Sequence, residues 1–218
     1  MERTYKVLLV DDHPIVRQGL AELIGRESDM TVCGQAESAA AALELTEKSQ
    51  PDLALVDISL DDMNGLVLVK GLKSRQRNLR VLILSMHDEA LYAERALRAG
   101  AHGYIMKREA PTKVITGIRR VLAGDVYLSD DISARIMRKF ASGTDAADES
   151  PVARLSDREL EVYNHIGQGL KTSQIAAKLN LSVKTIETYR EDIKEKLVLN
   201  DATELVQSAI KWVHGEGN

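Results

Sequence analysis

The sequence predicts an α/β domain built on a doubly wound, five-stranded parallel sheet, followed by a smaller all-α domain. The first observation is a set of short apolar runs, at Val7 to Val10, Leu53 to Val56, Val81 to Leu84 and Gly103 to Met106. The second is that stretches with helical spacing separate these runs, which is typical of a parallel sheet covered on both faces. The third is a change of composition after residue 140, beyond which only helical patterns recur.

Each predicted strand is followed by a predicted helix, as a doubly wound fold requires. The strands are expected near residues 5–10, 30–36, 52–56, 80–85 and 103–106. The first helix begins at about Pro14, and its predicted apolar face consists of Ile15, Leu20, Leu23 and Ile24.

We expect the first domain to span residues 1–124, and residues 125–150 to link it to a second domain at 151–218. Asp130 to Phe140 can form a short helix within this linker. Ala141 to Pro151 is small, acidic and polar, which is the composition of a flexible connector.

The second domain is predicted to consist of four short helices. Ser156 and Glu159 form a capping box ahead of an apolar run and mark the first helix. The other helices are expected at 172–179, at 183–197 and from 202 to about 214, with a turn at Asn180 to Ser182.

Composition bounds the class of protein. The 218 residues are 44 % hydrophobic and 28 % charged, which is ordinary for a soluble globular protein and excludes a chain disordered throughout. The net charge of -4 argues against a protein that coats nucleic acid, so any contact with nucleic acid must be local.

Cys33 is the only cysteine, so no internal disulfide can form. We expect it to be a buried packing residue in a protein from a reducing setting. With no signal peptide and no apolar run near the roughly 20 residues of a membrane span, the sequence predicts a cytoplasmic protein without a membrane partner.

Polar side chains follow the predicted strands at one edge of the sheet, where open α/β sheets bind ligands. Asp11 and Asp12 follow the first strand, Asp57 the third, Ser85 the fourth and Lys107 the fifth. Carboxylates about 4 Å apart repel by on the order of 4 kcal/mol at an effective dielectric near 20, so a cation is expected among them. Oxygen ligands favour Mg2+, with Asp57 as a nucleophile and with Lys107 and Ser85 stabilising a phosphoryl group.

Each of these residues, taken singly, also has a structural explanation. Two aspartates after a strand are commonly a helix cap, and a lone lysine is usually solvated. The combination at four strand ends favours phosphoryl chemistry.

Residues 5–124 resemble a bacterial response-regulator receiver domain. The resemblance rests on Asp11 and Asp12, on Asp57 in LVDISLDDMNG, on Ser85 in LILSMHD and on Lys107 in GAHGYIMK. It implies that Asp57 is the phosphoacceptor, and that the donor is the phosphohistidine of a sensor histidine kinase.

The same resemblance implies the roles of neighbouring residues. Asp12, Asp57 and the backbone carbonyl of Ser59 are expected to hold Mg2+, with Asp11 assisting through water. Tyr104 is expected to turn inward when the serine at the fourth strand closes on the phosphate. From the residues alone, Tyr104 is equally compatible with a half-buried strand aromatic.

Two positions depart from the pattern common in receivers, because Asp61 and Arg108 stand where proline is frequent. We expect Asp61 and Asp62 to add negative charge near the metal, and Arg108 to add positive charge beside Lys107. These departures bear on the phosphate lifetime and the choice of donor.

The second and third helices of the C-terminal domain, with the turn between them, have the dimensions of a helix-turn-helix. Its predicted inner core consists of Ile175, Ala176, Leu179, Leu181, Val183 and Ile186. Between Lys171 and Lys196, six basic residues stand against four acidic ones. On composition alone, a protein-binding bundle is therefore as compatible with the sequence as a DNA reader.

The segment LSDRELEVYNHIGQGLKTSQIAAKLNLSVKTIETYREDIKEKL resembles the LuxR-type helix-turn-helix that ends NarL/FixJ-type response regulators. The resemblance covers residues 151–214 and implies a dimer face on the final helix, from Thr203 to Val213. The expected DNA-binding residues are Lys171, Thr172, Lys184, Thr185, Glu187, Thr188, Arg190 and Glu191. The two glutamates can accept from cytosine amino groups, or they are solvated helix charges.

We therefore expect a two-component response regulator rather than an enzyme. Phosphorylation of Asp57 would favour a homodimer that binds promoter DNA and regulates transcription, with RNA polymerase as a further partner. One alternative is a Mg2+-dependent phosphatase with an aspartyl nucleophile, although Ser59 stands where such enzymes carry an acid. A second is a transcription factor whose receiver dimerises without phosphorylation, against which the intact pocket argues.

Overall fold

The computed structural model of the chain describes residues 4–86, 89–142 and 151–213. The chain divides into two compact units, Met1–Gly143 and Thr144–Asn218. The octapeptide at 143–150, which carries most of the expected flexible connector, lies outside the described residues. No helix among the described residues is both long and apolar enough to cross a membrane.

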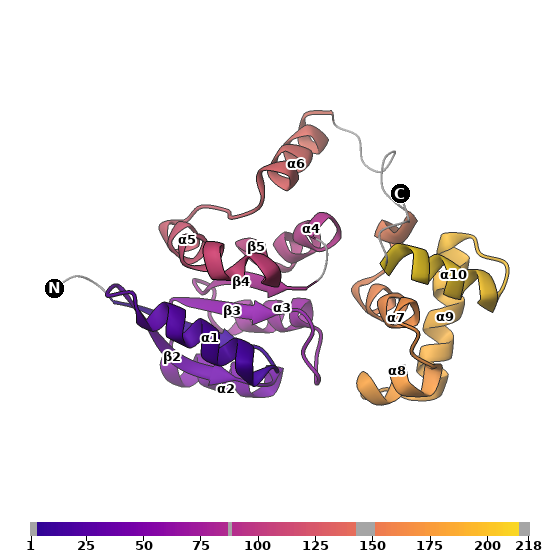
Figure 1. The fold of residues 1–218 in the computed structure, drawn as a ribbon, viewed down its shortest axis with the longest axis horizontal. Helices are drawn as coiled ribbons and strands as arrows, with labels where there is room; N and C mark the ends of the chain where they lie inside the picture. The colour runs from indigo at the N-terminus through magenta and orange to yellow at the C-terminus, as the bar shows by residue number, and fades with distance from the viewer. Residues whose placement is uncertain (1–3, 87–88, 143–150, 214–218) are drawn as a thin grey trace. The chain divides into compact units, whose positions relative to one another are not determined.

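The first unit contains a parallel sheet of five strands in the order β2-β1-β3-β4-β5 (Figure 1). The strands are β1 (Tyr5–Val10), β2 (Met30–Ala36), β3 (Leu53–Asp57), β4 (Arg80–Ser85) and β5 (Gly103–Met106). This strand order is the flavodoxin-like form of the doubly wound fold, which confirms the predicted fold class.

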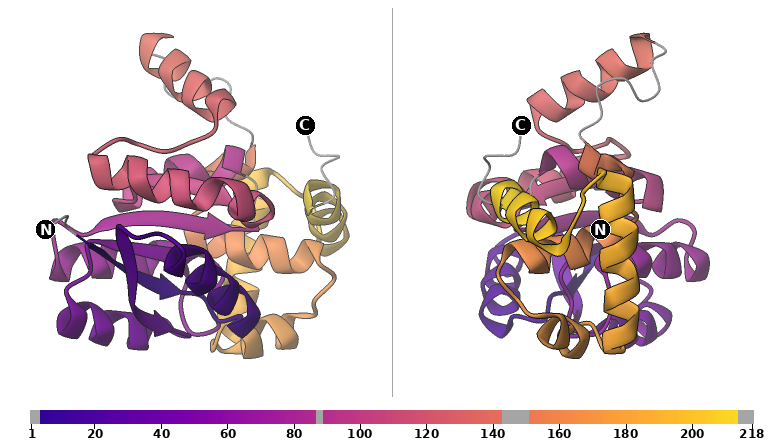
Figure 2. Two further views of the ribbon diagram at one scale, coloured as in Figure 1. Left: turned by 60° about the vertical axis from the view of Figure 1, so that its left-hand side comes forward. Right: turned by 90° about the vertical axis from the view of Figure 1, so that its right-hand side faces the viewer.

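Five helices cover the two faces of the sheet (Figures 1 and 2). They are α1 (Pro14–Gly25), α2 (Ala39–Ser49), α3 (Gly65–Arg75), α4 (Glu89–Ala99) and α5 (Ala110–Ala123). α1 packs against α5, whereas α3 contacts both α2 and α4. Alternate residues of the strands, such as Val7, Leu9 and Leu55, pack into one core with α1 and α5. Strands buried on both faces explain the continuous apolar runs in the sequence.

Helix ends follow the local sequence. The side chains of Ser38, Asn64, Ser156 and Ser182 each accept a hydrogen bond from a backbone N–H in the first turn of the helix that follows. Gly124 ends α5 with a φ of 101°, a conformation that a residue without Cβ adopts most readily.

One predicted helix face is wrong. α1 buries Leu20 and Ile24, but Ile15 is 86 % exposed. At 3.6 residues per turn, Ile15 is rotated by roughly 140° from Leu20 and by roughly 180° from Ile24, so it cannot share their face. Cys33, expected to be buried, is only half-buried, because it lies on the edge strand β2.

The segment after α5 packs against the edge of the sheet. Tyr127 O accepts from Tyr104 N at 2.8 Å, and Tyr127 N donates to His102 O at 3.0 Å, so this segment extends the sheet edge beside β5. The buried carboxylate of Glu89 then accepts from Ser129 N at 2.9 Å. The next helix, α6 (Asp130–Ser142), contacts α4 and extends away from the sheet (Figure 2).

The second unit is a bundle of four α-helices preceded by a 3-10 turn at Pro151–Arg154. The helices are α7 (Asp157–Gly167), α8 (Thr172–Lys178), α9 (Val183–Leu197) and α10 (Ala202–Val213). The predicted capping box of Ser156 and Glu159 is present. The Glu159 carboxylate also accepts from Lys196 Nζ at 2.6 and 2.8 Å, which joins the start of α7 to the end of α9.

The helix-turn-helix core is smaller than expected. Ile175, Ala176 and Ile186 are buried, and Leu179 and Leu181 are half-buried. Val183 is 45 % exposed, because it is the first residue of α9 and precedes the first turn that packs on α8. His214, the expected last residue of the final helix, lies outside the described residues.

We predict that His102 makes the stability of the first unit depend on pH. Burial, followed by the charges of Lys73 and Arg80, lowers the pKa of His102 from 6.5 to about 4. Its Nδ1 accepts from Val81 N at 3.2 Å, which requires an unprotonated nitrogen. Because the folded state disfavours the protonated form, this stabilisation is complete above pH 6.5 and is lost as the pH falls towards 4.

The test compares the wild type with His102→Asn, whose Oδ1 can still accept from Val81 N but cannot titrate. Chemical denaturation at pH 7.5 and pH 5 should show a larger loss of unfolding free energy in the wild type. Equal losses in the two proteins would contradict the assignment.

Candidate functional site

Three carboxylates lie together at the carboxyl edge of the sheet. Asp11 and Asp12 follow β1, Asp57 ends β3, and these two strands are neighbours. One ligand atom from each of these residues and from His13 lies within 4.8 Å of all the others. Asp11 and Asp57 are each only 2 % exposed, so little solvent screens their charges. The structure therefore brings together the acids that the strand ends predicted.

Lys107 is the cation of this cluster. Its Nζ lies 2.6 Å from Asp57 Oδ2 and 2.7 Å from Asp11 Oδ2, and its side chain is 10 % exposed. Burial lowers the pKa of Lys107, but the Asp57 and Asp11 carboxylates raise it more, so the ammonium stays charged. For Asp57 the balance is reversed: burial raises the pKa of its carboxyl, and Lys107 only partly offsets this.

The carboxylates keep acceptor capacity that the described residues do not use. The buried Asp57 Oδ1 has no hydrogen-bond partner among them. Asp11 Oδ2 lies 2.7 Å from Lys107 Nζ, and Asp12 Oδ1 lies 2.6 Å from His13 Nδ1. Neither oxygen accepts a hydrogen bond of good geometry from the described residues. Buried carboxylate oxygens with unused lone pairs are a donor set that fits a small, hard divalent cation.

The acceptor loop, residues 58–64, leads from Asp57 into α3. Ser59 is exposed and forms a β-bridge with Asn64. Burial raises the pKa of the Asp57 carboxyl, and the Ser59 backbone N–H opposes this slightly. Gly65 N donates to Ile58 O at 2.7 Å. A Cβ on Gly65 would come 2.2 Å from Asp57 O, so the close approach of the loop to the acceptor strand requires glycine here.

Ser85 and Tyr104 form a second polar pair beside the acids. Ser85 ends β4 and is fully buried, while Tyr104 lies in β5 and is 1 % exposed. Their side chains are hydrogen-bonded, and burial raises the pKa of the Tyr104 phenol. Tyr104 therefore points inward, and it is more deeply buried than an ordinary strand aromatic.

His13 and Arg17 also lie at the acidic site, although neither is among the predicted site residues. His13 Nδ1 joins the carboxylate cluster, and Arg17 donates to the backbone oxygen of Asp11. The position of His13 directly after the two aspartates was the available signal. Arg17 carries no comparable signal, because its role depends on the first turn of α1 facing the end of β1.

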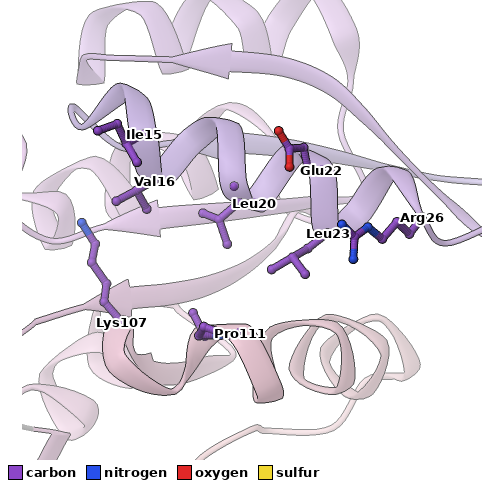
Figure 3. Close-up of a pocket in the computed structure, with 10 residues that line it drawn as sticks. Ile15, Val16, Leu20, Glu22, Leu23, Arg26, Lys107 and Pro111 are labelled. Atoms are coloured by element: carbon purple, nitrogen blue, oxygen red, sulfur yellow. The ribbon is translucent and has the colours of Figure 1, made fainter.

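An apolar groove lies beside Lys107, between α1 and α5 (Figure 3). Its apolar lining comes from Ile15, Val16, Leu20, Leu23, Ala110 and Pro111. The lysine side chain stands at one end of the groove, so the groove and the acidic cluster are neighbours.

The predicted outward face of α9 is exposed. Lys184, Glu187, Thr188 and Glu191 are all exposed, and Glu191 pairs with Lys194 at 2.8 Å. Thr185 and Arg190 are half-buried, and the Thr185 hydroxyl is shared with the Ser182 cap at 2.7 Å. At the start of α8, Lys171 is exposed and Thr172 is half-buried.

Comparison with known families identifies both units. Residues 7–119 match the family described as response regulator receiver domain, and residues 153–209 match the family described as bacterial regulatory proteins, luxR family.

Two relatives match this chain along nearly their whole length. The oxygen regulatory protein NreC of Staphylococcus carnosus is 33 % identical over 94 % of this chain and 97 % of its own. The nitrate/nitrite response regulator NarL of Escherichia coli is 30 % identical over 96 % of this chain and 95 % of its own.

Among solved structures, RcsB from Salmonella enterica serovar Typhimurium, bound to the promoter rprA with the phosphomimetic BeF3-, aligns with a TM-score of 0.66 at 25 % identity. The alignment covers 94 % of this chain and 98 % of the RcsB chain. The chain therefore belongs to the two-component response regulators of the NarL/FixJ type, in which a receiver domain precedes a LuxR-type DNA-binding domain.

Proposed function

We propose that a sensor histidine kinase phosphorylates this regulator on Asp57 in the presence of Mg2+, and that this controls dimerisation and binding to promoter DNA. The observation that carries the proposal is the buried Asp57 carboxylate, which has one oxygen on Lys107 and another without a hydrogen-bond partner among the described residues. That second oxygen is available as a nucleophile.

In the proposed reaction, an Asp57 oxygen attacks the phosphorus of a phosphohistidine. The new O–P bond forms as the P–N bond breaks, and the kinase imidazole leaves with the electron pair and takes up a proton. Lys107, held at 2.6 Å from Asp57, would follow the negative charge onto the phosphoryl oxygens. The Ser85 hydroxyl would donate to one of these oxygens and exchange its bond with Tyr104 for it.

Asp12, Asp57 and the Ser59 backbone carbonyl would hold Mg2+, with Asp11 contributing through water. The ion supplies positive charge that offsets the carboxylates and the transferring phosphoryl group. Asp11 and Asp12 orient this site, and the exposed Ser59 leaves one side open to the donor.

The kinase is proposed to approach over the groove between α1 and α5. Ile15, 86 % exposed, and Pro111 line this groove, and Lys107 connects it to the acids (Figure 3). An apolar surface next to a polar reaction centre would let a partner helix bind while its histidine reaches Asp57.

The second unit is proposed to read promoter DNA with α9 in the major groove. Lys184, Thr188 and Glu187 are the exposed side chains near the start of that helix, where recognition helices contact bases. Lys171 and Thr172 at the start of α8, with Thr185, Arg190 and Glu191 on α9, complete the proposed contact set. α10 would form the dimer face, and RNA polymerase would be a further partner on the promoter.

Two alternatives are less well supported. An aspartyl-nucleophile phosphatase needs an acid two residues after the nucleophile, and that residue is Ser59, whose hydroxyl is a poor general acid. A phosphorylation-independent regulator would have no use for two buried carboxylates and a third, half-buried one in a single cluster, since their repulsion destabilises the fold.

Asp57→Asn should abolish labelling by acetyl phosphate plus Mg2+, because the amide keeps the shape of the carboxylate but is not a nucleophile. The phosphorylated fraction can be measured by intact mass or on a phosphate-affinity gel. The exposed Asp61→Asn removes the same charge nearby and should remain labelled. Equal labelling of wild type and Asp57→Asn would refute the acceptor assignment.

Lys184→Ala should weaken the binding of phosphorylated protein to its promoter by roughly three- to thirtyfold, because one positive contact in the groove is lost. If Lys184 contacts a phosphate, the slope of log affinity against log salt should fall by about 1. Lys70→Ala, which removes an exposed lysine from α3 of the receiver, is the charge-matched control. Similar affinities for both variants would show that α9 does not read the DNA in this way.

A further inference from the structure

We propose that Asp62 is a positioning residue that fastens the acceptor loop to the start of α2, and that it does not add charge to the metal pocket. This inference rests on the proposed function, because it concerns the loop that would present Ser59 to Mg2+. It replaces the expectation that Asp61 and Asp62 act alike.

The Asp62 carboxylate spans the start of α2. Its Oδ1 accepts from Ala39 N at 2.9 Å, and its Oδ2 lies 3.3 Å from Ala40 N as a second acceptor. The Ser38 hydroxyl accepts from the next amide, Ala41 N, at 3.2 Å. The first three N–H groups of α2 are thus all bonded, and the negative charge of Asp62 is placed against the positive end of the helix dipole.

The Asp62 contact links the acceptor loop to the start of α2, which lies near the end of β1 and its two aspartates. Asp11 N donates to Ala36 O at 3.1 Å, so the connection between β2 and α2 lies beside the point where β1 delivers its two aspartates. Asp62 bonds the acceptor loop to this same connection, across 23 residues of sequence. Movement of the loop relative to Asp11 and Asp12 therefore requires the Asp62 contact to break.

The two ends of the loop are fixed independently. Gly65 N bonds Ile58 O, and Ser59 bridges Asn64, whose side chain accepts from Leu66 N at 2.9 Å. The residues between them have fewer anchors, and Asp62 supplies one that reaches a different helix. Fixing this part of the loop holds the Ser59 carbonyl in place before a cation binds, and preorganised ligands bind more tightly.

The chain provides two matched controls. Asp61 is the adjacent acid, it is exposed, and within the described part of the chain it has no hydrogen bond or ion pair. Ser38 caps the same helix end as Asp62, and its hydroxyl accepts from Ala41 N, within α2, and not from the acceptor loop. Asp61 variants therefore test charge alone, and Ser38→Ala tests loss of a helix cap alone.

The experiment measures the Mg2+ affinity of the full-length protein by calorimetry, with thermal unfolding in parallel. Asp62→Ala should weaken Mg2+ binding by about fivefold, the order expected when a loop has to be ordered as the ion binds. Asp62→Asn should fall between wild type and Asp62→Ala, because its amide oxygen still accepts from Ala39 N. Asp61→Asn should change the affinity by less than about twofold, as expected of an exposed charge. Ser38→Ala should lower the unfolding temperature and leave the affinity unchanged.

Three results would overturn the proposal. Equal effects of Asp61→Asn and Asp62→Asn would mean that both carboxylates act only through charge. Equal Mg2+ affinities of Asp62→Asn and Asp62→Ala would mean that the hydrogen bond from Ala39 N does not contribute. An unchanged affinity in a folded Asp62→Ala would mean that the contact does not position the loop.

Amide hydrogen exchange separates this proposal from the function on which it rests. The Ala39 and Ala40 amides should both exchange faster in Asp62→Ala than in Asp61→Asn, whether or not Mg2+ binds, whereas Asp62→Asn should keep Ala39 protected. If the wild type bound no Mg2+ but these amides were still protected by Asp62, the proposed metal site would be refuted and the proposed Asp62 contact would be supported. If the wild-type amides were unprotected, the Asp62 proposal would fail by itself.

Discussion

The receiver depends on one unfavourable interaction, the mutual repulsion of Asp11, Asp12 and Asp57 at the carboxyl edge of the sheet. Two carboxylates about 4 Å apart repel by on the order of 4 kcal/mol at an effective dielectric near 20. Lys107 contacts two of the three acids, and the third, Asp12, lies 2.6 Å from His13 Nδ1, so Lys107 alone does not balance the carboxylates. The hydrogen-bonded pairing of β1 with β3 keeps the acids together despite this repulsion. A fold that holds such charges in place is prepared for a cation and a phosphoryl group.

Contacts lead from this site towards α6, at the far end of the first unit. The buried Ser85 and Tyr104 side chains share a hydrogen bond, and burial raises the pKa of the Tyr104 phenol, with a smaller contribution from the Asp57 charge. The backbone of Tyr104 bonds Tyr127, and Glu89 at the start of α4 bonds Ser129 just before α6. Hydrogen bonds therefore connect the Asp57 side of the sheet with the start of α6.

The position of the acids was predictable from the sequence. Continuous apolar runs mark the strands, and the ends of parallel strands meet at one edge of the sheet. Val7 to Val10 and Leu53 to Val56 are continuous apolar runs, so the aspartates that follow them had to lie at the same edge of a parallel sheet. Ser156 and Glu159 likewise marked the start of α7 through a local rule that needs no tertiary information.

The remaining features depend on contacts between distant segments. Asp62 caps a helix start that is 23 residues away in the sequence. No local pattern reports this contact, so the sequence predicts only added negative charge near the metal. Tyr127 pairs with the edge of β5 only because β5 is the last strand of the sheet, which no local pattern reports. Ile15 is apolar like Leu20, but the helical angle between the two residues places it on the solvent face, so apolar character alone mispredicts it.

The most direct test is thermal unfolding of the wild type and Asp57→Asn at neutral pH, each with and without Mg2+. Because burial raises the pKa of Asp57, its ionised form disfavours folding, and the neutral amide should raise the melting temperature by a few degrees. Mg2+ should stabilise the wild type clearly and the variant much less. A variant that melts below the wild type and gains as much from Mg2+ would contradict the claim that carboxylate repulsion at Asp57 creates the cation site.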